Sequence, residues 1–182
     1  MDGIGMVTAP RGSTPGELRF ERLLPGDLAR VWHYVTDAEA RGRWLASGPM
    51  EPRLGGAVHL TWHNLDLSPH KVPAPEAHKD HENCGSMRGR IIRWEPPHAV
   101  GFTWGEGPDA SEVLIELSAL GESGGVRLVL THRRVFERPR LLSFTSGWHA
   151  HLDVLAEVLA GRVPGPFWAS IAALEEVYAA RL

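Results

Sequence analysis

Hydrophobic and polar residues alternate through much of the chain before its last quarter. This alternation is typical of strands in an antiparallel sheet with one covered face. It predicts strands at residues 17–24, 57–63, 86–94, 99–104, 112–117 and 126–132. Turn signals separate these strands, among them Pro25-Gly26, Gly55-Gly56 and the glycine-containing run 121–125, which favours a hairpin.

Two short helices are expected directly after the first strand. Asp27 is suited to cap the first of them, which carries apolar residues over 28–35. Thr36 or Asp37 can cap the second, which ends before Gly48-Pro49. Both helices therefore precede the main run of strands.

The last quarter of the chain has helical periodicity instead. Its apolar positions predict a long amphipathic helix over 145–160, with Gly161 as the residue that ends it. A linker at 162–166 leads to another helix over 167–181. This second helix has an apolar stripe of its own, which must pack either on its own domain or in a homodimer.

The order of these elements predicts an α+β domain over 17–161. A twisted antiparallel sheet of about six or seven strands would wrap around the long helix, which buries the apolar face of the sheet. One helix cannot fill the whole space inside such a sheet, so we expect a cavity between them. Residues 1–16 are expected to form a flexible leader, and 162–182 a linker and helical extension.

Composition narrows the function classes. Nineteen basic and 22 acidic residues give a net charge of −3, which argues against nucleic-acid binding. The single cysteine excludes an intrachain disulfide, and no apolar run is long enough for membrane insertion, so a cytoplasmic location is expected. Seven of the fourteen aromatic residues are Trp. We expect about three of them to face one interior space.

Local motifs along the chain carry a family resemblance. They are Phe20-Glu21-Arg22, Val31-Trp32, Trp44, Gly55-Gly56, Gly89, Glu95-Pro96-Pro97, Phe102-Thr103-Trp104, Leu130-Thr131-His132 and Gly147-Trp148 followed by Leu152-Asp153 and Leu155. In this order the motifs resemble the START-like (SRPBCC) superfamily, which has the helix-grip fold. Within it, the chain is similar to small bacterial single-domain members of the heat shock protein 90 ATPase activator homologue family.

The resemblance implies a helix-grip fold over about 17–161 that holds a hydrophobic ligand, such as a lipid or a polyketide, between sheet and helix. Some members of the superfamily are cyclases or other enzymes, but no catalytic signature transfers to this chain. The eukaryotic co-chaperone needs a separate N-terminal domain to stimulate its chaperone. The leader at 1–16 cannot supply that domain, which argues against a chaperone partner.

The inward-facing positions of the strands and the long helix are the candidate ligand-binding residues. They are Trp62, Phe102, Trp104, Leu128, Leu130, His132, Trp148, Leu152 and Leu155. The competing interpretation is ordinary core packing. The Trp residues favour a cavity, because bulky rings leave gaps and the indole N–H can orient a polar ligand group.

His132 is the candidate for catalysis. It shares the parity of Val126, Leu128 and Leu130, so its imidazole should point inward, where it could act as a general base or anchor a ligand. A core histidine with satisfied hydrogen bonds is the alternative. His151, beside the apolar stripe of the long helix, could reach the mouth of the cavity, but a solvated flank is the expectation.

The segment at 63–84 is rich in His and Pro. His78, His81 and Cys84 are spaced in a way compatible with zinc ligation. Structural zinc sites usually have a second pair of ligands, which is absent here, so neither metal nor cofactor is expected. A lid over the cavity is the favoured role, since a loop of this length in a compact domain is usually functional or disordered.

Three hypotheses follow. The first is a binding module without catalysis, which holds a small hydrophobic ligand. The second is an enzyme of the cyclase or hydratase type that uses His132. The third is a chaperone-associated stress protein. Nucleophile elbows, phosphate loops and dinucleotide fingerprints are absent from the sequence.

Overall fold

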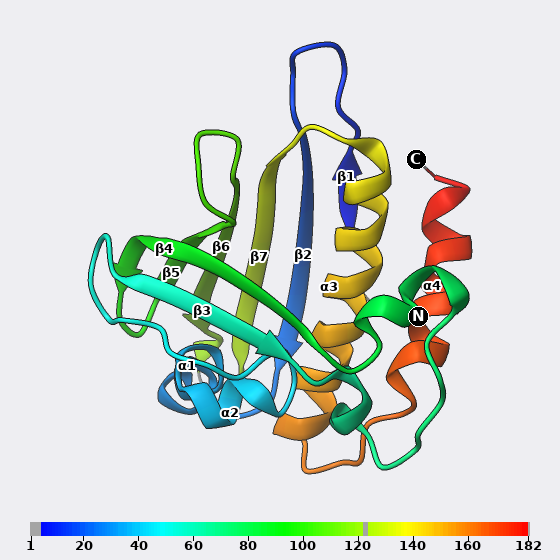
Figure 1. Ribbon diagram of the computed structural model, residues 1–182. Helices are drawn as coiled ribbons and strands as arrows, with labels where there is room; N and C mark the ends of the chain where they lie inside the picture. The colour runs from blue at the N-terminus through cyan, green and yellow to red at the C-terminus, as the bar shows by residue number, and fades with distance from the viewer. Residues whose placement is uncertain (1–4, 122–123, 182) are drawn as a thin grey trace.

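The computed structural model describes residues 5–121 and 124–181 (Figure 1). The strands are β1 (Met6–Thr8), β2 (Gly16–Leu24), β3 (Ala57–Trp62), β4 (Gly85–Glu95), β5 (Ala99–Trp104), β6 (Ser111–Ala119) and β7 (Val126–Val135). The helices are α1 (Leu28–Thr36), α2 (Ala38–Gly42), α3 (Arg138–Leu159) and α4 (Phe167–Ala179), and two short 3-10 helices, η1 (Asn64–Leu67) and η2 (Glu76–His81), lie between β3 and β4.

The strands of this described part form a seven-stranded antiparallel sheet in the order β1-β2-β7-β6-β5-β4-β3. Figure 1 shows the sheet curving around one side of α3, with α4 beside α3 on its other side. The predicted α+β arrangement, a sheet wrapped around a long C-terminal helix, is confirmed; the two short helices follow the strand expected to be first, which is β2.

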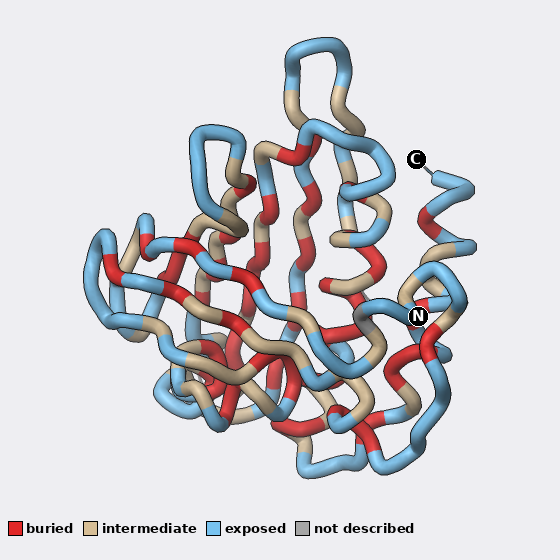
Figure 2. The backbone as a smooth tube through the Cα atoms, in the orientation of Figure 1, coloured by how far each residue is buried: buried red, intermediate tan, exposed pale blue. Residues whose placement is uncertain are grey.

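Alternation along the strands sets which face is covered. In β7, Val126, Leu128, Leu130 and His132 are all buried, and in the register of the sheet Leu130 lies opposite Phe20 of β2. The buried stretches lie along the strands and on α3, where these elements face one another (Figure 2). The core therefore lies between the sheet and α3, as the parity of the sequence predicts.

Both short helices begin at the expected capping residues. The Asp27 side chain accepts a hydrogen bond from the backbone N–H of Arg30, and the Asp37 side chain accepts from those of Glu39 and Ala40. These bonds satisfy backbone donors that the first helical turn leaves unpaired. The second helix, α2, is shorter than the sequence suggests, since it ends at Gly42.

Two sequence-based boundaries differ from the structure. Met6–Thr8, inside the expected leader, forms β1 and pairs with residues 17–19 of β2. The long helix begins at Arg138 rather than near residue 145. The sequence pattern does not reveal this start, because Pro139 lies in the first turn and because Ser143, Ser146 and Gly147 interrupt the apolar pattern. Of the predicted hairpin turn at 121–125, residues 122 and 123 lie outside the described residues.

The C-terminal helix packs against its own domain. Trp168, Ile171 and Tyr178 of α4 are buried. The hydroxyl of Tyr178 lies 2.8 Å from Nδ1 of His149 on α3 and accepts a hydrogen bond from the backbone N–H of Gly5 at 3.1 Å. No helix within residues 5–121 and 124–181 combines the length and the apolar character needed to cross a membrane.

Candidate functional site

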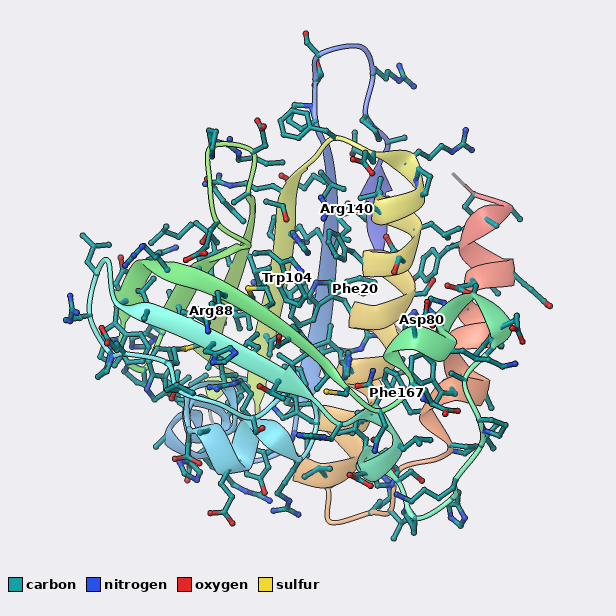
Figure 3. All side chains as sticks on the ribbon, in the orientation of Figure 1. Phe20, Asp80, Arg88, Trp104, Arg140 and Phe167 are labelled. Atoms are coloured by element: carbon teal, nitrogen blue, oxygen red, sulfur yellow. The ribbon has the colours of Figure 1, made fainter. Side chains whose placement is uncertain are left out.

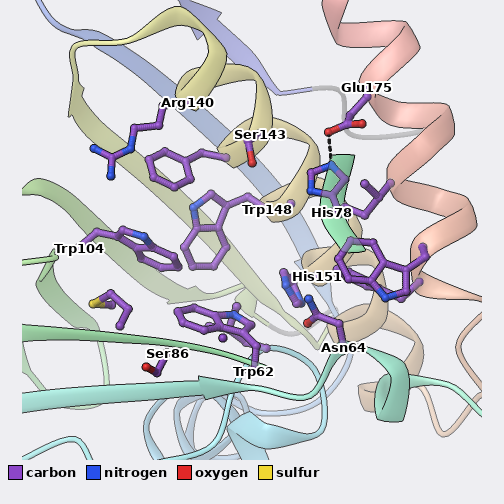
Figure 4. Close-up of a pocket in the computed structure, with 18 of the residues that line it drawn as sticks. Trp62, Asn64, His78, Ser86, Trp104, Arg140, Ser143, Trp148, His151 and Glu175 are labelled. Atoms are coloured by element: carbon purple, nitrogen blue, oxygen red, sulfur yellow. Dashed lines mark hydrogen bonds and ion pairs between the residues drawn. The ribbon is translucent and has the colours of Figure 1, made fainter. Parts of the chain in front are cut away.

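A pocket of about 520 Å³ lies between α3, α4 and the strands β3, β4 and β5 (Figure 4). Its lining consists of Leu45, Trp62, Asn64, His78, Gly85, Ser86, Met87, Trp104, Gly105, Arg140, Ser143, Phe144, Gly147, Trp148, His151, Phe167, Trp168, Ile171 and Glu175. The volume falls within the range of roughly 300–1,000 Å³ that is usual for small-molecule sites. We call this part of the sheet–helix space the hollow half.

Aromatic rings form the walls of the hollow half. The Trp104 ring centroid lies 5.3 Å from that of Trp62, 5.4 Å from that of Trp148 and 5.7 Å from that of Phe144. Trp168 of α4 contributes a further ring to the lining. Edge-to-face contacts of this kind are favourable geometries for aromatic pairs, so the rings support one another in the wall.

Small residues account for the empty volume. Gly85, Ser86, Gly105, Ser143 and Gly147 all lie in the lining and occupy little of its volume. A Cβ placed on Gly147 would meet no atom of the described residues within 4 Å, apart from its chain neighbours and the helix backbone. The pocket thus depends on the small residues that share its lining with the Trp rings.

The remaining apolar candidates lie elsewhere in the same sheet–helix space. Phe102, Leu128, Leu130, Leu152 and Leu155 are at most 1% exposed and are not among the pocket-lining residues. We call these five residues the filled half. Of the candidates from the sequence, Trp62, Trp104 and Trp148 are brought together at the pocket (Figure 3 labels Trp104 between the sheet and α3).

His132 lies behind the pocket wall rather than in the lining. The indole N–H of Trp148 donates to its Nδ1 at 3.0 Å, so Nε2 carries the ring proton and donates to the Ser111 hydroxyl at 2.8 Å. Burial, with a smaller contribution from the positive charge of Arg140, lowers the pKa of His132 to about 3. Both ring nitrogens are engaged and the ring is neutral, which leaves no lone pair to accept a substrate proton.

His151 is a lining residue that the sequence places wrongly on a solvated flank. It is only 6% exposed. Its Nδ1 lies 2.7 Å from the backbone carbonyl of Trp44, which can only accept, so Nδ1 carries the proton. Burial lowers the pKa of His151 to about 4. The ring is therefore neutral, and Nε2 keeps its lone pair. His151 is buried because α3 is covered on two sides, by the sheet and by α4.

The His-rich segment is anchored to α4. His78 Nε2 lies 2.7 Å from Glu175 Oε1, and the His78 ring stacks on Trp168 at 5.6 Å. Cys84 is exposed, and the side chain of His81 lies outside what the structure describes. Across the described side chains, no group of three or more His, Cys, Asp or Glu residues is placed to hold a metal ion.

Two further hydrogen bonds join the same segment to the C-terminal part of the chain. The indole N–H of Trp168 donates to the carbonyl of Glu82 at 3.1 Å, and the Ser68 hydroxyl donates to the carbonyl of Pro164 at 2.8 Å. Asn64 and His78 from this segment reach the pocket lining. The segment thus closes one side of the pocket together with α4.

Comparisons with known proteins agree with this architecture. Residues 27–160 match the family described as activator of Hsp90 ATPase homolog 1-like protein. The chain belongs to this family. A solved structure of the protein encoded by gene BPP1335 from Bordetella parapertussis is 41% identical, with 96% of this chain and 90% of that chain covered and a TM-score of 0.77.

More distant structures share the fold. CalU16 from Micromonospora echinospora is 22% identical, with 99% of this chain and 98% of that one covered and a TM-score of 0.69. DynU16, described as a putative protein in the dynemicin biosynthetic locus, is 18% identical, with 81% and 48% covered and a TM-score of 0.60. No curated protein matches. The family suggested by the sequence motifs is confirmed.

Proposed function

We propose that this protein binds a small hydrophobic molecule in the hollow half of its sheet–helix space. The observation that carries the proposal is the pocket of about 520 Å³ walled by Trp62, Trp104 and Trp148. Tight packing is the rule in protein interiors, and voids larger than a water molecule are few. A cavity of this size with mostly apolar walls and a few polar groups has the character of a ligand site.

Binding without catalysis fits the polar groups better than an enzyme does. The hydrogen bonds of His132 to Trp148 and Ser111 leave it unsuited to act as a general base. The Arg140, Asn64 and His151 side chains in the lining can recognise a ligand. Nothing in this set supplies an activated nucleophile, which would need a base within hydrogen-bond reach.

Filling the pocket from Gly147 tests the proposal. Gly147→Phe should place a ring in the space next to α3 and lower the affinity for biphenyl, used as a planar apolar probe, by more than about tenfold, which corresponds to 1.4 kcal/mol. Gly147→Ala is the matched control, because its methyl group occupies little of the volume, and it should bind as the wild type does. Calorimetric titration measures both variants, and circular dichroism checks that they fold. Equal binding of biphenyl by all three proteins would contradict the proposal.

The family description favours a second candidate, association with a heat shock protein 90 chaperone. In that case the purified protein should raise the ATPase rate of a bacterial heat shock protein 90. An unchanged rate at saturating protein would remove this candidate. The Gly147→Phe variant separates the two roles, since it changes the pocket and leaves the molecular surface outside it intact.

A further inference from the structure

Residues on one face of α3 make the two ends of the pocket chemically different. Arg140, Phe144, Trp148 and His151 all line it and follow one another at intervals of four, four and three residues, which places them on one side of the helix. The eleven residue-to-residue steps from Arg140 to His151 span about 16 Å along the axis, at 1.5 Å per residue. In Figure 4, Trp148 lies between Arg140 at one end and His151 at the other. The stripe therefore presents a cation, two aromatic rings and an imidazole in that order.

The cationic end is open to a ligand. Within the described residues, the Arg140 guanidinium has no ion pair and no hydrogen bond to another side chain. The nearby Arg133 and Arg134 differ, because each pairs with Glu112, at 2.7 Å and 3.7 Å. Asp109 and Glu137 line a smaller hollow that Arg140 also borders, but neither carboxylate is within ion-pair distance of it. Arg140 is thus free to receive an anionic group.

The imidazole at the other end can accept a hydrogen bond from a ligand and cannot donate one. The only N–H of the neutral His151 ring is engaged with the Trp44 carbonyl, so Nε2 offers a lone pair. Asn64, also in the lining, has a buried Oδ1 without a hydrogen-bond partner in the described part of the chain. The Glu175 carboxylate adds another acceptor, already paired with His78. A buried acceptor without a donor is costly, so this end favours a ligand that brings one.

We infer that the ligand is an aromatic acid that carries a hydroxyl group at the end opposite to its carboxylate. The carboxylate would pair with Arg140, the rings would lie against Phe144 and Trp148, and the hydroxyl would donate to Nε2 of His151. This inference rests on the proposed function, and it adds the chemical class and the orientation of the ligand. The hydroxyls of Ser86 and Ser143 can either donate or accept a hydrogen bond, so they do not alter the preference for a ligand hydroxyl near His151.

A matched series of rod-shaped probes tests the inference on the wild-type protein. The series consists of 4′-hydroxybiphenyl-4-carboxylic acid, biphenyl-4-carboxylic acid, 4-phenylphenol and biphenyl, titrated by calorimetry. Removing the hydroxyl should weaken binding by about 3- to 10-fold, the effect of one neutral hydrogen bond. Removing the carboxylate should weaken it by about 2- to 5-fold, since Arg140 is exposed to solvent, and this difference should shrink in high salt.

Two variants test which residues cause the preferences for the hydroxyl and the carboxylate. His151→Asn keeps a donor for the Trp44 carbonyl near the position of Nδ1 but removes Nε2, so it should abolish the preference for the hydroxyl and keep that for the carboxylate. Arg140→Gln should do the reverse. Arg133→Gln is the matched control, because Arg133 is exposed, paired with Glu112 and absent from the lining, and it should keep both preferences.

The outcomes separate the two proposals. If biphenyl binds and neither polar group improves its affinity, the inference is wrong and the proposed function stands. If the preferences survive in His151→Asn and Arg140→Gln, the inference is also wrong. If none of the four probes binds to the wild type, both proposals fail. Because the probe series is decided on the wild-type protein, the test remains valid even if a variant does not fold.

Discussion

The hollow half and the filled half lie between the same sheet and the same helix, yet one encloses a pocket and the other is solid. In the filled half, Leu128 and Leu130 of β7 and Leu152 and Leu155 of α3 are fully buried in the core. In the hollow half, Trp rings from β3, β5 and α3 share the lining with glycines and serines. The two halves share β5 and α3 but differ in side-chain size, and β3, β4 and α4 border the hollow half where β7 borders the filled half.

This contrast shows how one fold can provide both stability and a binding site. Truncating a fully buried leucine typically costs about 2 to 5 kcal/mol of unfolding free energy, so the filled half supplies stability. The rings of the hollow half are held by contacts with one another. Trp62 and Trp104 are only half-buried. The following variants change one half at a time and are ordered by the expected effect.

The largest effect is expected in the filled half. Leu152→Ala should lower the free energy of unfolding by about 3 kcal/mol, because a fully buried side chain would leave a cavity that its neighbours cannot close. Urea unfolding measures this change. Trp62→Ala, in the hollow half, should cost less stability but weaken biphenyl binding. If Trp62→Ala is the more destabilising of the two, the contrast between the halves is wrong.

Acidification should destabilise the fold through the two buried histidines. Each has a pKa in the folded state, about 3 for His132 and about 4 for His151, that lies below the unfolded value of 6.5. The unfolded chain therefore takes up protons first as the pH falls. The stability that each neutral histidine contributes is fully present above about pH 6.5. It is lost as the pH falls toward the folded pKa, and the loss in unfolding free energy between pH 7 and pH 5 is about 2 kcal/mol per histidine.

Unfolding of the wild type at pH 7 and pH 5 measures this loss. His151→Asn should reduce the difference in unfolding free energy between the two pH values by about 2 kcal/mol, the contribution of one histidine. Carboxylates such as Glu21 and Asp37 contribute little in this window, because their pKa values are lowered by hydrogen bonds and lie below it. An equal pH dependence in the variant would show that His151 is not buried in its neutral form.

The boundary between the halves is marked by the hydrogen bond from Trp148 to His132. Trp148→Phe keeps a ring in the pocket wall but removes the N–H donor, which leaves Nδ1 of the buried His132 without its partner. The expected cost is about 1 to 2 kcal/mol in urea unfolding. A second readout is the His132 tautomer: nitrogen NMR should show the proton on Nε2 in the wild type. A proton on Nδ1 would contradict the assignment.

The smallest effect is expected in the hollow half. Gly147→Ala should raise the free energy of unfolding by about 0.5 to 1 kcal/mol, because alanine favours the helix and its methyl group points into open space. Thermal unfolding measures the gain, and biphenyl titration should show unchanged affinity. A loss of stability would mean that the space beside Gly147 is already filled.

The sequence predicts the fold in most respects because alternation and capping are local signals. The parity of Val126, Leu128 and Leu130 identifies the covered face of β7, and Asp27 marks the start of α1. The start of α3 is the main exception. Its first turns carry Ser143 and Gly147, which weaken the apolar pattern because they line a pocket and not a core.

The site is less predictable than the fold. Parity places Trp62 and Trp104 on the covered face but treats Phe102 in the same way, since it gives no information on which part of that face is filled. The lining from α4, such as Trp168, and the role of His151 depend on where the C-terminal helix packs. That packing is a contact between distant segments, which one sequence does not encode in any local pattern.

The strand order also has a consequence for how the molecule folds. β2 pairs on one side with β7, and the ion pair that spans the two strands joins Glu21 to Arg127, residues separated by 106 positions. The strands from β3 to β7 can instead pair with their neighbours in sequence. Because distant pairings slow folding, closure of β2 onto β7 is the expected rate-limiting step, and on the ribosome β2 cannot complete its pairing until Val135 at the end of β7 has been made.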